Sequence, residues 1–109
     1  MIEIEAVLDE SGILRACKAG GHAGAGRTGT DIVCAAVSVL MRTAVRSLNG
    51  KIGITVRWEA PEPGVLSLEA DYTAEGSGFL FATGVFLVEG LSSVAEEYPE
   101  HCRLTIRRK

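Results

Sequence analysis

A histidine and a cysteine that lie close together in the sequence carry the clearest chemical signal. His22 opens a glycine-rich stretch, and Cys34 follows in the segment that we predict to be a helix. A cysteine near the start of a helix has its thiolate favoured by the helix dipole. A histidine within hydrogen-bond reach would favour the thiolate further and could then protonate a leaving amine. The pair supplies the nucleophile and the base that acyl transfer by a thiol needs at minimum. One His and one Cys at this spacing are by themselves a weak signal of catalysis.

Two more polar residues share the helix face of Cys34. Asp31 lies three positions before it and Ser38 four positions after it, which places all three side chains on one side of a helix. Asp31 could orient His22 or only cap the helix. Ser38 could hold the thiol or the imidazole by a hydrogen bond, or bond back to its own helix backbone. The other positions are apolar or small, so this polar stripe needs partners, which the glycine-rich loop could bring.

The glycine-rich loop has more than one interpretation. Residues 20–29 include five glycines and no large apolar side chain, so the segment cannot pack a core and should be mobile. It could be a flexible connector, or a lid that admits an extended peptide, with the N–H groups of Gly20 and Gly21 in an oxyanion hole. The run from Gly24 to Gly29 also matches G-x-G-x-x-G. The preceding strand belongs to a hairpin, however, and no acidic residue follows at the spacing of a dinucleotide site, so nucleotide binding is a weak hypothesis.

The length and composition indicate one globular domain, residues 1–109, with 47% apolar residues and a net charge of −3. The acidic balance argues against a direct nucleic-acid partner. The alternating acidic start excludes a secretory signal, and we expect a cytoplasmic protein. We find no apolar run that would span a bilayer and expect no membrane partner. Three cysteines without a C-x-x-C pair indicate neither a metal site nor a redox motif, and we predict no metal and no cofactor.

The hydrophobic pattern predicts an α+β fold with the order ββαββαβ. Alternation predicts strands, and an apolar 3.6-residue period predicts two helices. Thr30 is the expected N-cap of the first helix, and Gly84 and Gly90 are expected to mark close packing in the second. A mostly antiparallel sheet with both helices packed against it is the natural arrangement. The expected strands are 2–8, 13–19, 52–60, 65–72 and 102–107, and the expected helices are 30–48 and 79–98.

The site residues resemble a known family. The blocks Gly21-His22-Ala23-Gly24 and Asp31-Ile32-Val33-Cys34-Ala35-Ala36-Val37-Ser38, with Gly29 between them, look like the signature of the ribosomal-processing cysteine protease (Prp) family. The resemblance implies a cytosolic bacterial endopeptidase that removes a short N-terminal extension from a large-subunit ribosomal protein. It implies Cys34 as the nucleophile, His22 as the general base, and accessory roles for Asp31 and Ser38.

The resemblance also implies a homodimer, a pocket for an aromatic substrate residue near Cys34, and a loop that orders over the substrate. The expected substrate contacts are Gly21, Gly24, Gly26, Arg27 and Gly29. This sequence departs from the family inside the loop, where Ala25 and Gly26 stand in place of a bulkier residue such as tyrosine. Arg27 could replace that contact or be solvated. The rival hypothesis is a non-catalytic peptide-binding module in ribosome assembly, in which Cys34 is a core residue.

Overall fold

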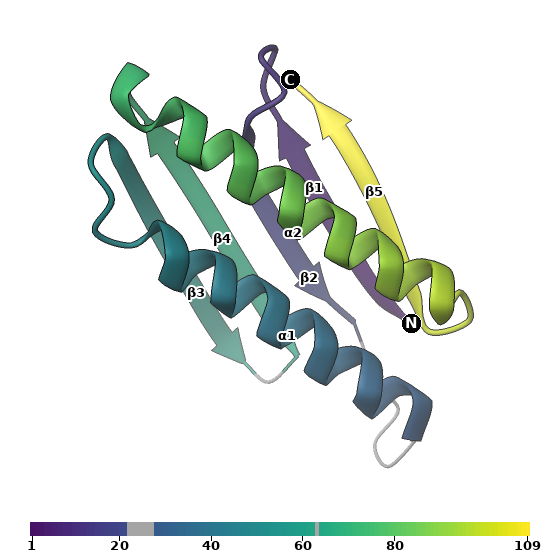
Figure 1. The fold of residues 1–109 in the computed structure, drawn as a ribbon. Coiled ribbons are helices and arrows are strands. Elements are labelled where there is room, and N and C mark those ends of the chain that lie inside the picture. The colour runs from purple at the N-terminus through teal and green to yellow at the C-terminus, as the bar shows by residue number, and fades with distance from the viewer. Residues whose placement is uncertain (22–27, 63) are drawn as a thin grey trace.

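The chain folds into one sheet with two helices on one of its faces (Figure 1). The computed structural model describes residues 1–21, 28–62 and 64–109, and for residues 28–30 it describes the backbone alone. The described elements follow the predicted order, with a short 3₁₀ turn, Ala74–Gly76, before the second helix. They are β1 (Ile2–Leu8), β2 (Leu14–Gly20), α1 (Thr28–Leu48), β3 (Ile54–Glu62), β4 (Val65–Tyr72), α2 (Ser77–Glu97) and β5 (Cys102–Arg108).

The sheet is mixed rather than purely antiparallel. Its strand order is β3-β4-β2-β1-β5, and three of the four described pairings are antiparallel. The fourth, between β1 and β5, is parallel and sets Ile2 opposite Cys102. The α2 helix runs back along the sheet between β4 and β5, and such a crossover delivers the next strand in the same direction as the one before it. The predicted α+β fold is confirmed, with one parallel pair at the β5 edge.

Alternating side chains position the core between the sheet and the helices. On β1, Ile2, Ile4 and Ala6 are buried, while Glu3 is exposed on the opposite face. Helix α1 contributes one apolar stripe to the same core, which includes Met41. Burial of such apolar area is the main favourable term in folding.

Two glycines of α2, Gly84 and Gly90, mark close packing, as predicted. A Cβ atom at Gly84 would lie 2.8 Å from the Cβ atom of Leu14, and one at Gly90 would lie 3.0 Å from the Cδ2 atom of Leu40. Gly84 therefore lets α2 approach β2, and Gly90 lets α2 approach α1.

Several predicted boundaries are wrong by one or two residues. Helix α1 begins at Thr28, so Thr30 lies in its first turn rather than at the N-cap, and Gly29 is helical rather than part of the loop. Thr28 and Thr30 are both residue types that begin helices, so composition does not choose between them. Strand β3 begins at Ile54 and runs through Pro61, which an edge strand tolerates because its outer N–H groups need no partner.

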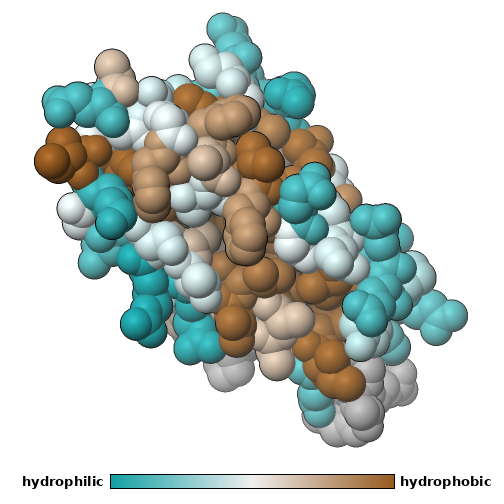
Figure 2. Space-filling view, in the orientation of Figure 1, coloured by the Kyte–Doolittle hydropathy of each residue, from teal (hydrophilic) through white to brown (hydrophobic). Residues whose placement is uncertain are grey.

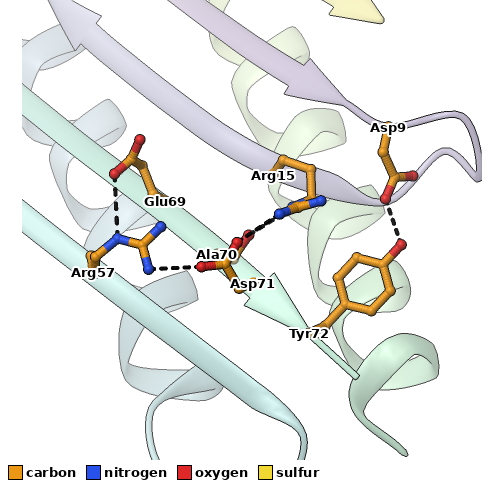
Figure 3. Close-up of polar contacts among 7 residues, drawn as sticks. All are labelled: Asp9, Arg15, Arg57, Glu69, Ala70, Asp71 and Tyr72. Atoms are coloured by element: carbon orange, nitrogen blue, oxygen red, sulfur yellow. Dashed lines mark hydrogen bonds and ion pairs between the residues drawn. The ribbon is translucent and has the colours of Figure 1, made fainter. Parts of the chain in front are cut away.

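Charged side chains cover the sheet face that the helices leave open. Arg57 contacts Glu69 at 3.4 Å and Asp71 at 2.9 Å, and Arg15 contacts Asp71 at 2.6 Å (Figure 3). Both arginines therefore share one aspartate. These ion pairs are about half exposed, so each contributes little to stability.

A separate hydrogen bond ties the β1–β2 turn to β4. The Tyr72 hydroxyl donates to an Asp9 carboxylate oxygen at 2.5 Å (Figure 3). This bond lowers the pKa of Asp9 and raises the pKa of Tyr72.

The expectation that no apolar run could span a bilayer has to be set against the length and composition of α2. Together with the 3₁₀ turn before it, α2 gives a helical segment, Ala74–Glu97, that is long and apolar enough to cross a membrane by length and composition alone. One side of α2 packs into the core, through Leu80, Leu87 and Leu91. Apolar side chains continue around to the outer side, where Phe79 and Phe86 are exposed. Figure 2 shows apolar residues across the outer face of the helical layer.

Candidate active site

The first half of α1 lines a cleft that contains Cys34. The cleft has a volume of about 290 Å³, and Cys34 and Ser38 are its reactive or polar side chains. Its apolar walls come from α1 and three strands, through Val37, Ile2, Ala19 and Leu66. The first turns of α1 and the starts of β1 and β5 lie at the same end of the molecule (Figure 1). A thiol therefore stands at the wall of an apolar cleft that is open to solvent.

The described surroundings of Cys34 favour its neutral form. Burial raises the pKa of the half-buried Cys34 thiol, and the negative charge of Asp31 raises it further. The positive charge of the amino terminus acts in the opposite direction. Because α1 begins at Thr28, Cys34 lies in the second turn, where the helix dipole is weaker than in the first turn. The dipole thus favours the thiolate less than the sequence suggested, and an activating base has to supply the difference.

The accessory residues flank Cys34 along α1. Asp31 is exposed in the first turn, and its carboxylate accepts no hydrogen bond from the described part of the chain. Ser38 is half-buried and lines the cleft, and its backbone carbonyl accepts a hydrogen bond from Arg42 Nε at 3.4 Å. Both alternative roles of each residue stay predictions.

The other predicted site residues are placed only in part. His22, Gly24, Gly26 and Arg27 lie outside the described residues, so their roles stay predictions. Gly21, just after β2, has a φ of +141°, and a Cβ atom there would overlap the carbonyl oxygen of Met1. Only glycine fits this position, because its backbone passes so close to the start of β1.

Sequence reasoning missed the strand residues that wall the cleft. Ile2, Ala19 and Leu66 lie on three strands, and alternation marks each of them only as inward-facing. Gly64, in the β3–β4 turn with a φ of +84°, completes the rim. These positions can be recognised as part of the cleft only when the strand order and register are known, because these bring the three strand ends together.

The described residues do not provide a metal site. No group of three or more His, Cys, Asp or Glu side chains among residues 1–21, 28–62 and 64–109 could hold a metal ion. The three cysteines are free thiols: Cys17 and Cys102 are buried, and Cys34 is half-buried. Among the described cysteines, Cys34 is therefore the one whose side chain lines the cleft.

Comparison with known proteins gives a family for this fold and cleft. The sequence profile described as "Cysteine protease Prp" matches residues 1–103. No curated protein sequence matches this chain at a significant level.

Solved structures share the whole fold. The structure of SMU.848 from Streptococcus mutans is 29% identical with a TM-score of 0.83, over 100% of this chain and 96% of that one. The essential ribosomal processing protease Prp from S. aureus, in complex with a substrate peptide, is 21% identical with a TM-score of 0.82, over 98% of this chain and 100% of that one. A complex of the S. aureus protease with a covalently linked product peptide has a TM-score of 0.80 at 22% identity.

Proposed function

This chain belongs to the family of the cysteine protease Prp, and we propose that it is a cysteine endopeptidase that removes the N-terminal extension of a large-subunit ribosomal protein. The observation that carries the proposal is the position of Cys34, half-buried on the wall of an apolar cleft about 290 Å³ in volume. A cysteine with only a packing role would not need to face such a cleft. The likeness to a solved protease with a covalently linked product peptide supports the same assignment.

In the proposed reaction, the Cys34 thiolate attacks the carbonyl carbon of the scissile peptide bond. His22 takes the thiol proton and then gives it to the leaving amine, and water hydrolyses the thioester. Burial and Asp31 raise the pKa of Cys34, so the thiolate depends on a nearby imidazolium. This dependence makes His22 the more important partner of Cys34, with Asp31 and Ser38 in supporting roles.

The cleft suits a substrate with an apolar side chain next to the cleaved bond. Ile2, Val37 and Leu66 offer apolar contact, with Cys34 on the adjoining wall, and such a site would take the aromatic residue that the family resemblance implies. The net charge of −3 is compatible with a basic ribosomal protein as substrate. We place this reaction in the cytoplasm, where ribosomes are assembled and thiols stay reduced.

We also propose that the protein is a homodimer joined through the outer face of its helices. A groove of about 310 Å³ lies between α1 and α2, and its walls include Leu40, Phe79 and Phe86. Phe86 is 73% exposed beside this groove. A two-fold symmetric pair requires a projecting side chain and a groove on the same face. Each copy can then insert its Phe86 into the groove of the other.

Cleavage of the natural substrate tests the endopeptidase. The purified chain is incubated with the extended ribosomal protein from the same organism, and the products are identified by mass spectrometry. We expect one cut at the end of the extension, loss of cleavage in Cys34→Ala and His22→Ala, and normal cleavage in Cys17→Ala, whose thiol is buried away from solvent. Equal cleavage by Cys34→Ala would overturn the assignment. Binding without cleavage by the wild type would instead favour the peptide-binding module.

A further inference from the structure

A second thiol lies next to the wall of the Cys34 cleft. Cys102 is the first residue of β5 and is 3% exposed. It belongs to the same core cluster against which Cys34 packs. In the β1–β5 pairing Cys102 stands opposite Ile2, and Ile2 lines the cleft together with Cys34. Neighbouring strands lie about 4.8 Å apart, so Cys102 is one strand away from the cleft wall.

The two thiols are close enough to interact electrostatically. Burial raises the pKa of Cys102, and the charge of Cys34 raises it further. Cys17 offers a contrast within the same core cluster, because burial alone raises its pKa, to about 12. Of the two buried thiols, only Cys102 has a pKa that the charge of Cys34 raises.

We propose that Cys102 is the resolving thiol of Cys34, so that a peroxide converts the pair reversibly into a disulfide. The Cys34 thiolate attacks one oxygen of hydrogen peroxide, which leaves a sulfenic acid on Cys34 and releases hydroxide. The Cys102 sulfur then attacks the Cys34 sulfur. The S–O bond breaks, the S–S bond forms, and water leaves with the Cys102 proton.

Oxidation of Cys34 makes the following attack by Cys102 easier. The Cys34 thiolate carries a negative charge that opposes ionisation of Cys102. A sulfenic acid is neutral, so oxidation of Cys34 removes that charge and makes the Cys102 thiolate easier to form. Burial still opposes its ionisation, so we expect the second step to be the slower one.

Cys102 lies at one end of an edge strand, next to the wall of the Cys34 cleft. A disulfide requires its two Cα atoms to lie about 4.4–6.8 Å apart. Cys102 begins an edge strand and directly follows the turn at residues 99–101. The start of β5 pairs with β1 alone, and the Cys102 N–H donates to the carbonyl oxygen of Tyr98 in the preceding turn. Cys17, in contrast, lies inside β2, which is paired on both sides. The geometry therefore selects Cys102 over Cys17.

This inference rests on the proposed function, in which Cys34 is a reactive nucleophile. The disulfide would block peptide cleavage while it lasts and would protect Cys34 from irreversible oxidation. Reduction by a dithiol would restore the nucleophile.

The test is oxidation of the purified protein with hydrogen peroxide, followed by disulfide mapping under non-reducing conditions. The wild type, Cys102→Ala and Cys17→Ala are compared, and thermal unfolding confirms that each variant is folded. We expect the wild type and Cys17→Ala to lose two hydrogens, to link Cys34 to Cys102, and to regain cleavage after reduction. Cys102→Ala should instead gain two or three oxygens on Cys34 and lose its recoverable activity.

Other results of the same experiment would contradict the proposed disulfide. A wild type that forms no Cys34–Cys102 link, or that over-oxidises Cys34 as fast as Cys102→Ala does, would overturn the proposal. A link from Cys34 to Cys17, or between two chains, would also overturn it. Mapping on the wild type needs no variant and no substrate, so it still decides the question if the untreated protein proves unable to cleave.

Discussion

Replacement of Phe86 by aspartate should dissociate the proposed homodimer. Phe86 is 73% exposed in the single chain and lies beside the groove between α1 and α2. A phenylalanine side chain presents roughly 200 Å², so about 150 Å² is left for a partner to cover. At about 25 cal/mol per Å² this corresponds to about 3.5 kcal/mol for each copy and about 7 kcal/mol for a symmetric pair.

The expected effect is large even if burial is incomplete. One third of that sum, about 2.3 kcal/mol, would weaken the dimer roughly fortyfold. Aspartate adds a charge that the apolar groove cannot solvate, so the loss should be greater. Phe81→Asp is the matched control, because Phe81 is also exposed on α2, at 46%, but lies toward the β1–β2 turn, near Gly12.

Sedimentation equilibrium over a range of protein concentrations measures this effect. We expect a dimer for the wild type and for Phe81→Asp, and a folded monomer for Phe86→Asp. A monomeric wild type, or equal dissociation by both variants, would refute the reasoning. A monomeric wild type that co-floats with phospholipid vesicles would assign the apolar face of α2 to a membrane surface instead, in keeping with its length and composition.

Three further predictions concern the cleft and the fold. The charge of Asp31 raises the pKa of the Cys34 thiol. If Asp31 acts only through this charge, Asp31→Asn should speed the alkylation of Cys34 at neutral pH, measured by mass spectrometry. Slower alkylation would mean that Asp31 orients the base. Gly84→Ala should cost about 1–3 kcal/mol in denaturant unfolding, because the new Cβ atom would lie 2.8 Å from Leu14; an unchanged midpoint would contradict this close packing. Tyr72→Phe should lower the stability measured by denaturant unfolding at neutral pH, because the variant cannot donate the hydrogen bond to Asp9. The carboxylate partner, Asp9, has a lowered pKa in the folded state. The difference in stability between the variant and the wild type should therefore shrink as the pH falls below 3.8, the ordinary pKa of this carboxyl group. A pH-independent difference would argue against the hydrogen bond.

Much of the fold could be predicted from the sequence because local patterns fixed the element types. Alternation on β1, with Ile2, Ile4 and Ala6 buried, follows directly from the two-residue period of a strand. The parallel pairing of β5 with β1 did not follow from any local pattern, because it depends on where α2 crosses the sheet. The exposed apolar side chains on the outer side of α2 did not follow from the sequence either, because the local pattern does not show which apolar residues the sheet and α1 cover.

The candidate site could be predicted only where its residues are neighbours in sequence. Helical spacing predicted that Ser38 and Asp31 lie near Cys34; Ser38 lines the same cleft, and the charge of Asp31 acts on the Cys34 thiol. The apolar walls from Ile2 and Leu66 needed the sheet order, which no single strand contains. The predicted start of the helix was two residues late, and this error made the dipole at Cys34 seem stronger than its second-turn position allows.

The pH dependence of Cys34 alkylation tests the central claim most directly. The native protein is treated with iodoacetamide across pH, and each cysteine is followed by mass spectrometry. An ordinary free thiol titrates near about 8.5. If Cys34 is the activated nucleophile, it alone reacts fast at pH values near 6, and His22→Ala slows it toward the behaviour that burial and Asp31 impose. If Cys34 reacts no faster than the buried Cys17 and Cys102, with or without a substrate-like peptide, the proposed nucleophile is contradicted.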